Sequence, residues 1–209
     1  MIYWGPKKTN SKKNSSSSND DDDDEVDLDV TVTENHIYFH TDVTGKSVKQ
    51  LITAIQKLNK PGKLYREIWV HINCWGGTVY DALAVVDVMV ASPTPIVTII
   101  EGMAASAATM LSIAGDRRLI RPSGVMLIHQ LRGGEYGKKC DVEDEMENLE
   151  KLEDRLVEYY VSNTKIRESK FRKMMGRELE YSAETCLKLG LVDEIYKGEE
   201  ILGKRKRKR

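Results

Sequence analysis

The sequence predicts an α/β fold in one domain. Short apolar runs rich in β-branched residues alternate with segments of helical spacing, and glycines fall at the junctions between them. The chain has 209 residues, of which 40% are hydrophobic, so it can bury a full core and shows no need for a second one. Together these observations favour strands and helices packed in layers around one core.

The two ends of the chain differ in composition from the rest. Residues 1–27 form an acidic, low-complexity segment that cannot repay the entropy of ordering, so we expect it to be disordered. Residues 200–209 form a basic tail that ends in an unbroken run of Lys and Arg. That run is either a nucleic-acid or nuclear-targeting patch, or else a solubilising, flexible tail or an electrostatic partner of the acidic segment, and we favour the second interpretation. The folded domain is therefore predicted at residues 28–199.

The first helix is expected to begin at Thr44 or Ser47, either of which can cap it. The stretch Gly45-Lys46-Ser47 looks like the end of a phosphate-binding loop, but that motif needs a glycine where His40 stands. We therefore expect no ATPase in this chain. The apolar positions that follow helical spacing are Val48, Leu51, Ile52, Ile55 and Leu58.

A buried strand is predicted over residues 66–73, and a helix over residues 79–89. Between them lies the pair Gly76-Gly77. Two glycines after a strand and ahead of a helix let backbone amides point into a pocket with no side chain in the way. The pair alone is weak support for a functional site.

The next buried strand is predicted over residues 95–100, ending at Gly102. Good helix formers start at Ala104, so Ser106 should lie in the first turn of a helix. There the unpaired N–H groups and the positive helix end would stabilise a developing oxyanion. A serine at such a junction is more often structural, because small residues let helices pack closely, so other residues must support a catalytic role.

His129 follows the apolar run 125–128 and is the candidate base. An isolated histidine there would usually be a core residue bonded to a neighbour. A serine nucleophile needs a base, however, and this histidine accompanies Ser106 and the glycine pairs Gly76-Gly77 and Gly133-Gly134. A catalytic role for His129 is therefore favoured.

A long amphipathic helix is predicted over residues 141–163. At least part of its apolar stripe is expected to pack against its own domain. The stripe consists of residues at steps of three and four, namely Val142, Met146, Leu149, Leu152, Leu156 and Tyr159.

In this order, the motifs resemble those of the proteolytic subunit of the caseinolytic (Clp) protease family, peptidase family S14. The resemblance runs from about Val30 to Lys197 and implies a crotonase-like (ClpP-type) α/β fold of repeated ββα units with a long handle helix. The segments that carry it are His71-Ile-Asn-Cys-Trp-Gly-Gly77, similar to the family's Tyr-Ile-Asn-Ser-Pro-Gly-Gly, then Gly102-Met-Ala-Ala-Ser106, Val125-Met-Leu-Ile-His129-Gln130 with Gly133-Gly134, and the closing stretch from Tyr181 to Glu194.

The resemblance implies a role for each matching residue. Ser106 is the expected nucleophile, and His129 is the base that takes its proton and later returns it to the leaving amine. The backbone N–H groups of Gly77 and Ala107 are the expected oxyanion hole, each donor being worth on the order of 10²–10³ in rate. Such chemistry needs neither a cofactor nor a metal.

Gly133 and Gly134, on an expected strand after His129, would bind an extended peptide as an added strand. The third triad position departs from the family, because its aspartate falls on Glu178 here. Glutamate can orient an imidazole, but it is longer by about 1.5 Å. Glu180 is the neighbouring candidate, although it points the other way in an extended segment. Leu131 stands where the family usually has proline and affects the course of the strand rather than the chemistry.

The resemblance also implies partners. We expect unfolded polypeptide substrates, a separate Clp-type AAA+ unfoldase acting in trans, and a homo-oligomer of two stacked seven-subunit rings. Nucleic acid is not an expected partner. The sequence has no apolar segment long enough for a membrane and no signal-peptide core, so a cytoplasmic location is expected. The odd set Cys74, Cys140 and Cys186 favours neither a disulfide frame nor a zinc site.

Two other functions stay open on the sequence. One is a catalytically impaired ring subunit or structural partner, for which Glu178 is the main support. The other is an acyl-CoA enzyme, because coenzyme A enzymes share this fold and fold does not determine function. The divergent tails, the lysine-rich composition and the unusual third residue suggest a copy carried by a phage or virus.

Overall fold

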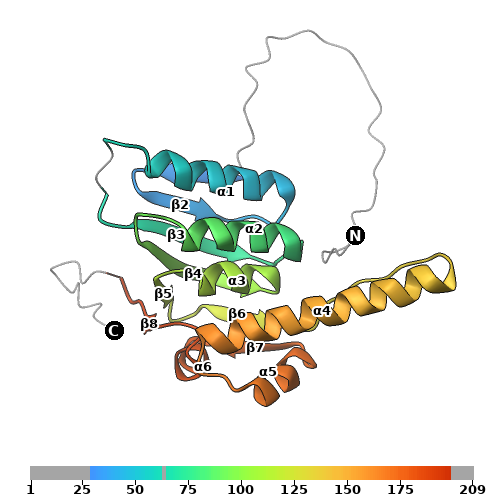
Figure 1. Ribbon diagram of the computed structural model, residues 1–209. Helices are drawn as coiled ribbons and strands as arrows, with labels where there is room; N and C mark the ends of the chain where they lie inside the picture. Colours follow the sequence, from blue (N-terminus) through green and yellow to red (C-terminus); the bar gives the residue numbers. More distant parts are fainter. Residues whose placement is uncertain (1–28, 63–64, 199–209) are drawn as a thin grey trace, which may run out of the picture.

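The computed structural model describes residues 29–62 and 65–198. The predicted tails 1–27 and 200–209 lie outside these residues. Within them the order of elements is that of an α/β protein (Figure 1). The strands, in chain order, are β1 (Val30–Thr33), β2 (His36–Phe39), β3 (Ile68–Cys74), β4 (Ile96–Ala105), β5 (Arg117–Ile120), β6 (Val125–Ile128), β7 (Leu179–Ser182) and β8 (Glu194–Ile195).

The strands form one mixed, eight-stranded sheet. Its main path has the order β1-β2-β3-β4-β5-β8, and β6 pairs with β4 and with β7. The pairs β1–β2 and β6–β7 are antiparallel, and the others are parallel. Strand β4 is therefore central, since it pairs with β3 on one side and with β5 and then β6 on the other. Parallel strands buried on both faces have nearly continuous apolar sequences, and residues Ile96–Ile100 of β4 are all buried, with Thr98 as the one polar residue among them.

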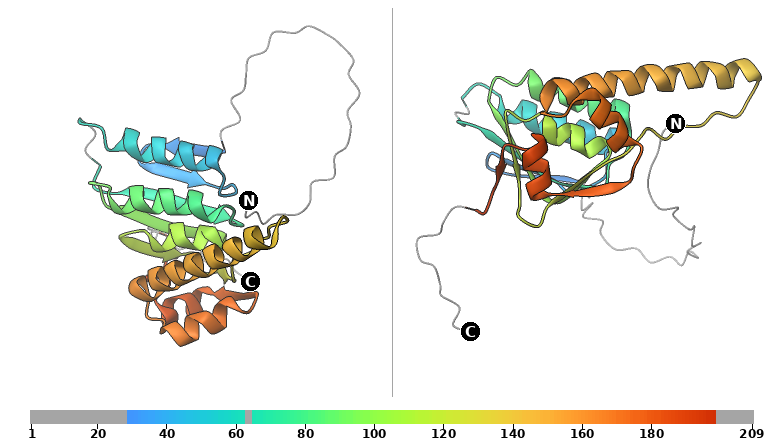
Figure 2. Two further views of the ribbon diagram at one scale, coloured as in Figure 1. Left: turned by 45° about the vertical axis from the view of Figure 1, so that its right-hand side comes forward. Right: turned by 90° about the horizontal axis from the view of Figure 1, so that it is seen from below.

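The helices α1, α2 and α3 lie side by side on one face of the sheet (Figures 1 and 2). Helix α4 crosses below them and extends well beyond the sheet, and α5 and α6 follow it near β7. In the described part of the chain, no helix has the length and apolar character needed to cross a membrane. The helices are α1 (Gly45–Leu58), α2 (Val79–Val90), α3 (Ala107–Ile113), α4 (Lys139–Asn163), α5 (Glu168–Met175) and α6 (Ala183–Leu189).

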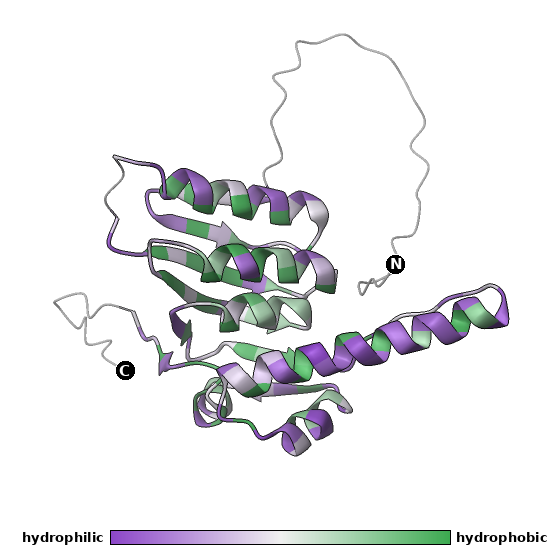
Figure 3. Ribbon diagram, viewed as in Figure 1, coloured by the Kyte–Doolittle hydropathy of each residue, from purple (hydrophilic) through white to green (hydrophobic). Residues whose placement is uncertain are grey.

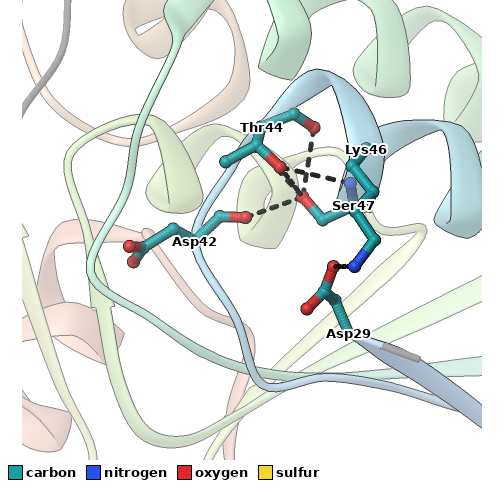
Figure 4. Close-up of polar contacts among 5 residues, drawn as sticks. All are labelled: Asp29, Asp42, Thr44, Lys46 and Ser47. Carbon is teal, nitrogen blue, oxygen red and sulfur yellow. Dashed lines mark hydrogen bonds and ion pairs between the residues drawn. The ribbon is translucent and has the colours of Figure 1, made fainter. Parts of the chain in front are cut away.

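The residues Gly45-Lys46-Ser47 form the first turn of α1 (Figure 4). Thr44 is the N-cap, and its side chain accepts from the Ser47 N–H at 3.2 Å while the Ser47 hydroxyl accepts from the Thr44 N–H at 3.0 Å. Lys46 pairs with Asp29 at 2.8 Å. Both predicted capping residues therefore contribute, in a reciprocal capping box.

Helix α4 confirms the predicted long amphipathic helix, although it begins slightly earlier, at Lys139. Its distal half is largely hydrophilic in Figure 3. Met146, in that half, is 54% exposed, whereas Leu152 and Tyr160 near the other end are buried in the core. Of the predicted stripe, the C-terminal half therefore packs into the core of its own domain.

The boundary predicted between the central strand and its helix was wrong. Strand β4 does not end at Gly102 but runs on to Ala105, and α3 begins at Ala107 rather than Ala104. The residues beyond Gly102 stay extended because they pair with β6, in the register Met103↔Val125 to Ala105↔Leu127. Helix propensity is a weak preference that such pairing overrides.

The strand predicted to carry Gly133 and Gly134 was also wrong. In the structure the segment between β6 and α4 has no strand, and it runs back along α4 (Figure 1). A Cβ built on Gly133 would lie 3.0 Å from Leu149 of α4, so the segment packs closely against that helix. A strand needs a neighbouring strand to pair with, and no described strand pairs with this segment.

Candidate active site

Ser106 lies at the sharp turn between β4 and α3. Its backbone has φ 54° and ψ −127°, which a residue other than glycine rarely adopts. Such strain costs on the order of 1–3 kcal/mol and persists only where the surroundings enforce it. The Ser106 N–H donates to the Leu127 carbonyl of β6 at 2.8 Å, so the strand pairing holds the turn in place. The side chain is left partly exposed at the end of the buried strand.

His129 follows β6 directly and stands at the same edge of the sheet. Because β4 and β6 are parallel, their carboxyl ends meet there. His129 Nδ1 lies 2.6 Å from the Gln130 carbonyl oxygen. A carbonyl can only accept, so this hydrogen bond places the proton on Nδ1 and leaves Nε2 as the acceptor. That tautomer is the one a base needs in order to take a proton from a serine.

One pocket brings the predicted chemistry together. Ser106, His129, Gly77 and Ala107 all line it, although they come from three different segments. The remaining walls are mostly apolar and come from the helices α2 to α5 and from the end of β6 with the segment that follows it. They consist of Val79, Met110, Ile128, Gln130, Leu131, Arg132, Leu156, Tyr160, Phe171 and Met175.

The loop Gly76-Gly77 approaches both Ser106 and the segment before α1. Val43 N–H donates to the Gly76 carbonyl at 2.7 Å, and Val43 forms a parallel bridge with Gly77. A Cβ on Gly77 would lie 2.0 Å from the Val43 carbonyl oxygen, and one on Gly76 would lie 2.7 Å from the Ser106 Cβ. Both residues also have positive φ. Only glycine therefore lets the backbone come this close to the nucleophile.

Glu178 is exposed and hydrogen bonds to Arg132. The ladder between β6 and β7 ends with Ile128 opposite Leu179. Continued by one residue, that register sets Glu178 opposite His129, and directly opposite residues have Cβ atoms about 4.5–5.5 Å apart. This extension of the register would set the predicted third residue beside the histidine, while its carboxylate bonds to Arg132. Sequence reasoning gave Arg132 no role.

Gly133 and Gly134 are exposed and do not line the pocket. Nothing lies within 4 Å of a Cβ built on Gly134.

Two further residues near the nucleophile, Thr109 and Tyr160, escaped the sequence analysis. Both are polar residues in helices that the fold buries. A single sequence does not distinguish a buried polar residue of a helix from an exposed one.

A second polar cluster joins β2, β3 and β4 outside this pocket. His36 Nδ1 lies 2.9 Å from His71 Nε2, and His71 Nδ1 lies 3.2 Å from Glu101, which Arg121 binds at 2.7 Å. Burial lowers the pKa of His71, although Glu101 acts in the opposite direction. Burial alone would raise the pKa of Glu101, but Arg121 and His71 outweigh it and hold this pKa below its usual range.

Comparison with known proteins agrees with this geometry and with the resemblance in the sequence. The family model described as Clp protease matches residues 22–199. The chain is also 34% identical, over 161 residues, to the ATP-dependent Clp protease proteolytic subunit of Deinococcus radiodurans, an alignment that covers 76% of this chain and 78% of that protein. The mixed sheet and long helix α4 are those of the ClpP-type, crotonase-like fold. The chain therefore belongs to the Clp protease family and is a serine peptidase of the Clp type.

Proposed function

We propose that the chain is an endopeptidase that hydrolyses peptide bonds in unfolded polypeptides through an acyl-enzyme on Ser106. The observation that carries this proposal is the shared pocket of Ser106, His129, Gly77 and Ala107. A nucleophile, a base with its Nε2 available as acceptor, and two backbone amides are the parts that acyl transfer requires.

In the first step His129 Nε2 accepts the Ser106 hydroxyl proton while Oγ attacks the peptide carbonyl carbon. The tetrahedral oxyanion accepts hydrogen bonds from the N–H groups of Gly77 and Ala107. Ala107 is the first residue of α3, and the first amides of a helix have no partner within it. His129 then protonates the leaving amine, and water attacks the acyl-enzyme by the same route in reverse.

Glu178 is the proposed orienting group for His129. Its place in the extended β6–β7 register supports this role. In this structure the Gln130 carbonyl occupies His129 Nδ1, and Arg132 holds Glu178. A working triad therefore requires the Glu178 carboxylate to exchange Arg132 for the imidazole. The two side chains that part in this exchange, Arg132 and Glu178, are both exposed, so its barrier is small compared with a backbone rearrangement.

Substrate binding is proposed at two places. Gly133 and Gly134 would present backbone groups to an extended peptide once the segment leaves α4, in the manner of an added strand. The apolar walls of the pocket, among them Met110, Leu156 and Phe171, would take an apolar side chain next to the bond that is cut.

An assembly that encloses the active sites would protect other proteins from this peptidase. The exposed half of α4, with Val142 and Met146, supports association through this helix. We propose a homo-oligomer of two stacked seven-subunit rings, served by a separate Clp-type ATPase that unfolds substrates. The name of the Deinococcus radiodurans relative, a proteolytic subunit of an ATP-dependent protease, supports a partner of this kind.

The test is covalent labelling of the purified protein by a fluorophosphonate, together with cleavage of an unfolded protein substrate. We expect labelling and cleavage in the wild type, and neither in Ser106→Ala or His129→Gln. Ser123→Ala is the matched control, because Ser123 is an exposed serine in the loop before β6. Labelling that persists in Ser106→Ala would refute the assignment of the nucleophile.

A catalytically impaired ring subunit is the second candidate. The Glu178–Arg132 pair favours it, because Arg132 competes with His129 for the Glu178 carboxylate. An assembled oligomer of this chain that is neither labelled by the fluorophosphonate nor able to cleave the substrate would support this candidate and refute the peptidase.

A further inference from the structure

The backbone carbonyl of Ser106 is held by a buried threonine. The Thr109 N–H and the Thr109 hydroxyl both donate to it, at 3.0 Å and 2.6 Å. Thr109 has no exposed surface. A hydroxyl has one hydrogen, so the Thr109 Oγ1 that donates to the carbonyl can only accept in its remaining hydrogen bond.

Tyr160 supplies that remaining hydrogen bond from α4. Its hydroxyl contacts Thr109 Oγ1, and Tyr160 must be the donor because the Thr109 hydrogen is already used. Tyr160 is 4% exposed, and its ring stacks on Phe171 with centroids 4.4 Å apart. Burial raises the pKa of Tyr160, so the hydroxyl stays protonated as a donor. The chain of donors thus runs from Tyr160 through Thr109 to the Ser106 carbonyl.

This carbonyl belongs to the same peptide unit as the Ala107 N–H. The described residues contain no cis peptide bond, so the carbonyl and the N–H of this planar unit point in opposite directions. Fixing the carbonyl toward Thr109 therefore fixes the N–H toward the opposite side. The Gly76-Gly77 loop lies close by, since a Cβ on Gly76 would be 3.3 Å from the Ala107 nitrogen.

We propose that Thr109 and Tyr160 are positioning residues for the oxyanion hole, which orient the Ala107 N–H through the Ser106 carbonyl. This inference rests on the proposed function, in which the Ala107 N–H stabilises the oxyanion. It also gives α4 a link to the chemistry, because a residue of the long helix acts on the nucleophile turn. Hydrogen-bond donors of this kind work only when they are aimed at the oxyanion before the reaction begins.

The test compares variants that remove single hydroxyls. Thr109→Val keeps the shape of the side chain and is expected to lower kcat about tenfold or more, toward the roughly 10²–10³ that one oxyanion donor is worth. KM should change less than about twofold. Thr109→Ser keeps the hydroxyl and should restore most of the loss. Tyr160→Phe should cost about three- to tenfold, and the double variant with Thr109→Val should be no worse than Thr109→Val alone, because Tyr160 acts through Thr109.

Tyr159→Phe is the matched control. Tyr159 is the neighbouring tyrosine of α4, and its hydroxyl donates to the Met110 carbonyl at 2.9 Å instead of to the Thr109 chain. This variant should keep kcat within about twofold. The melting temperature of every variant should stay above the assay temperature, so that the protein is folded when kcat is measured.

Inhibition by a peptide aldehyde distinguishes a role in positioning the oxyanion hole from a role in folding alone. Its adduct with Ser106 forms an oxyanion, so its inhibition constant should weaken by the same factor as kcat/KM falls in Thr109→Val and Tyr160→Phe. Ser106-dependent cleavage with unchanged kcat in both variants, or an equal loss in Tyr159→Phe, would overturn this inference and leave the proposed function standing. A wild type without Ser106-dependent cleavage would overturn both.

Discussion

Replacing Arg132 by glutamine is expected to raise kcat about two- to fivefold. The reason is the position of Glu178, which must leave Arg132 before its carboxylate can orient His129. Glutamine removes the charge of the guanidinium and keeps a polar, though shorter, side chain. The change therefore weakens the competing interaction without adding a new apolar surface at the pocket.

The magnitude follows from the exposure of the pair. The side chains of Arg132 and Glu178 are 44% and 59% exposed, so solvent screens their attraction. Exposed ion pairs are worth about 0.4–1 kcal/mol at the upper end of their range. At 1.4 kcal/mol for each factor of ten, about 0.4–1 kcal/mol corresponds to about two- to fivefold in the population of the productive arrangement.

The assay is hydrolysis of a fluorogenic peptide at ionic strengths from about 0.05 M to about 0.5 M, a range over which the Debye length falls severalfold. Wild-type kcat should rise with salt, and that of Arg132→Gln should already be high and respond less. Arg66→Gln, the same change of charge in the loop before β3, should behave as the wild type. A fall in kcat in Arg132→Gln would refute the reasoning and show that Arg132 supports the active arrangement.

Three further predictions concern stability. Gly77→Ala should destabilise the fold and impair activity, because its Cβ would lie 2.0 Å from the Val43 carbonyl oxygen, whereas Gly134→Ala, with an open site, should leave the thermal midpoint unchanged. His71→Tyr should flatten the loss of stability in acid: burial lowers the pKa of His71 below its ordinary 6.5, so the folded protein binds fewer protons than the unfolded chain, and stability falls as the pH drops from about 6.5 toward the folded-state pKa. Melting curves between about pH 7.5 and pH 5.5 measure this, and an unchanged slope would contradict it. Thr44→Ala should cost about 0.5–2 kcal/mol in urea unfolding, because it removes the cap of α1, and an effect near zero would show that Ser47 suffices.

Much of the fold could be read from local pattern. The α1 stripe, the α4 stripe and the buried strand at Ile96–Ile100 are periodic over many residues, and such patterns have few alternative explanations. The errors arose where pairing between distant segments overrides local preference. Ala104 and Ala105 prefer a helix but extend β4, because β6 provides a partner strand for them.

The candidate site divides in the same way. Ser106, His129 and the pair Gly76-Gly77 are visible in the sequence because each occupies a recognisable local junction, and the structure brings all three segments to one pocket. The predicted strand at Gly133-Gly134 was wrong because its stability depends on a neighbour that the described residues do not supply.

The sequence by itself determined the helices α1 and α4, the buried strand at Ile96–Ile100, the glycine loop, and which serine and histidine follow buried strands, because these features depend on neighbours within a few residues. Only the tertiary structure decided that Arg132 holds Glu178 and that Tyr160 reaches Thr109, which is 51 positions away in the chain. Hydrogen bonds of this kind depend on how whole elements pack against one another. The pattern of residues along one segment does not predict which atom of a distant segment will be its partner.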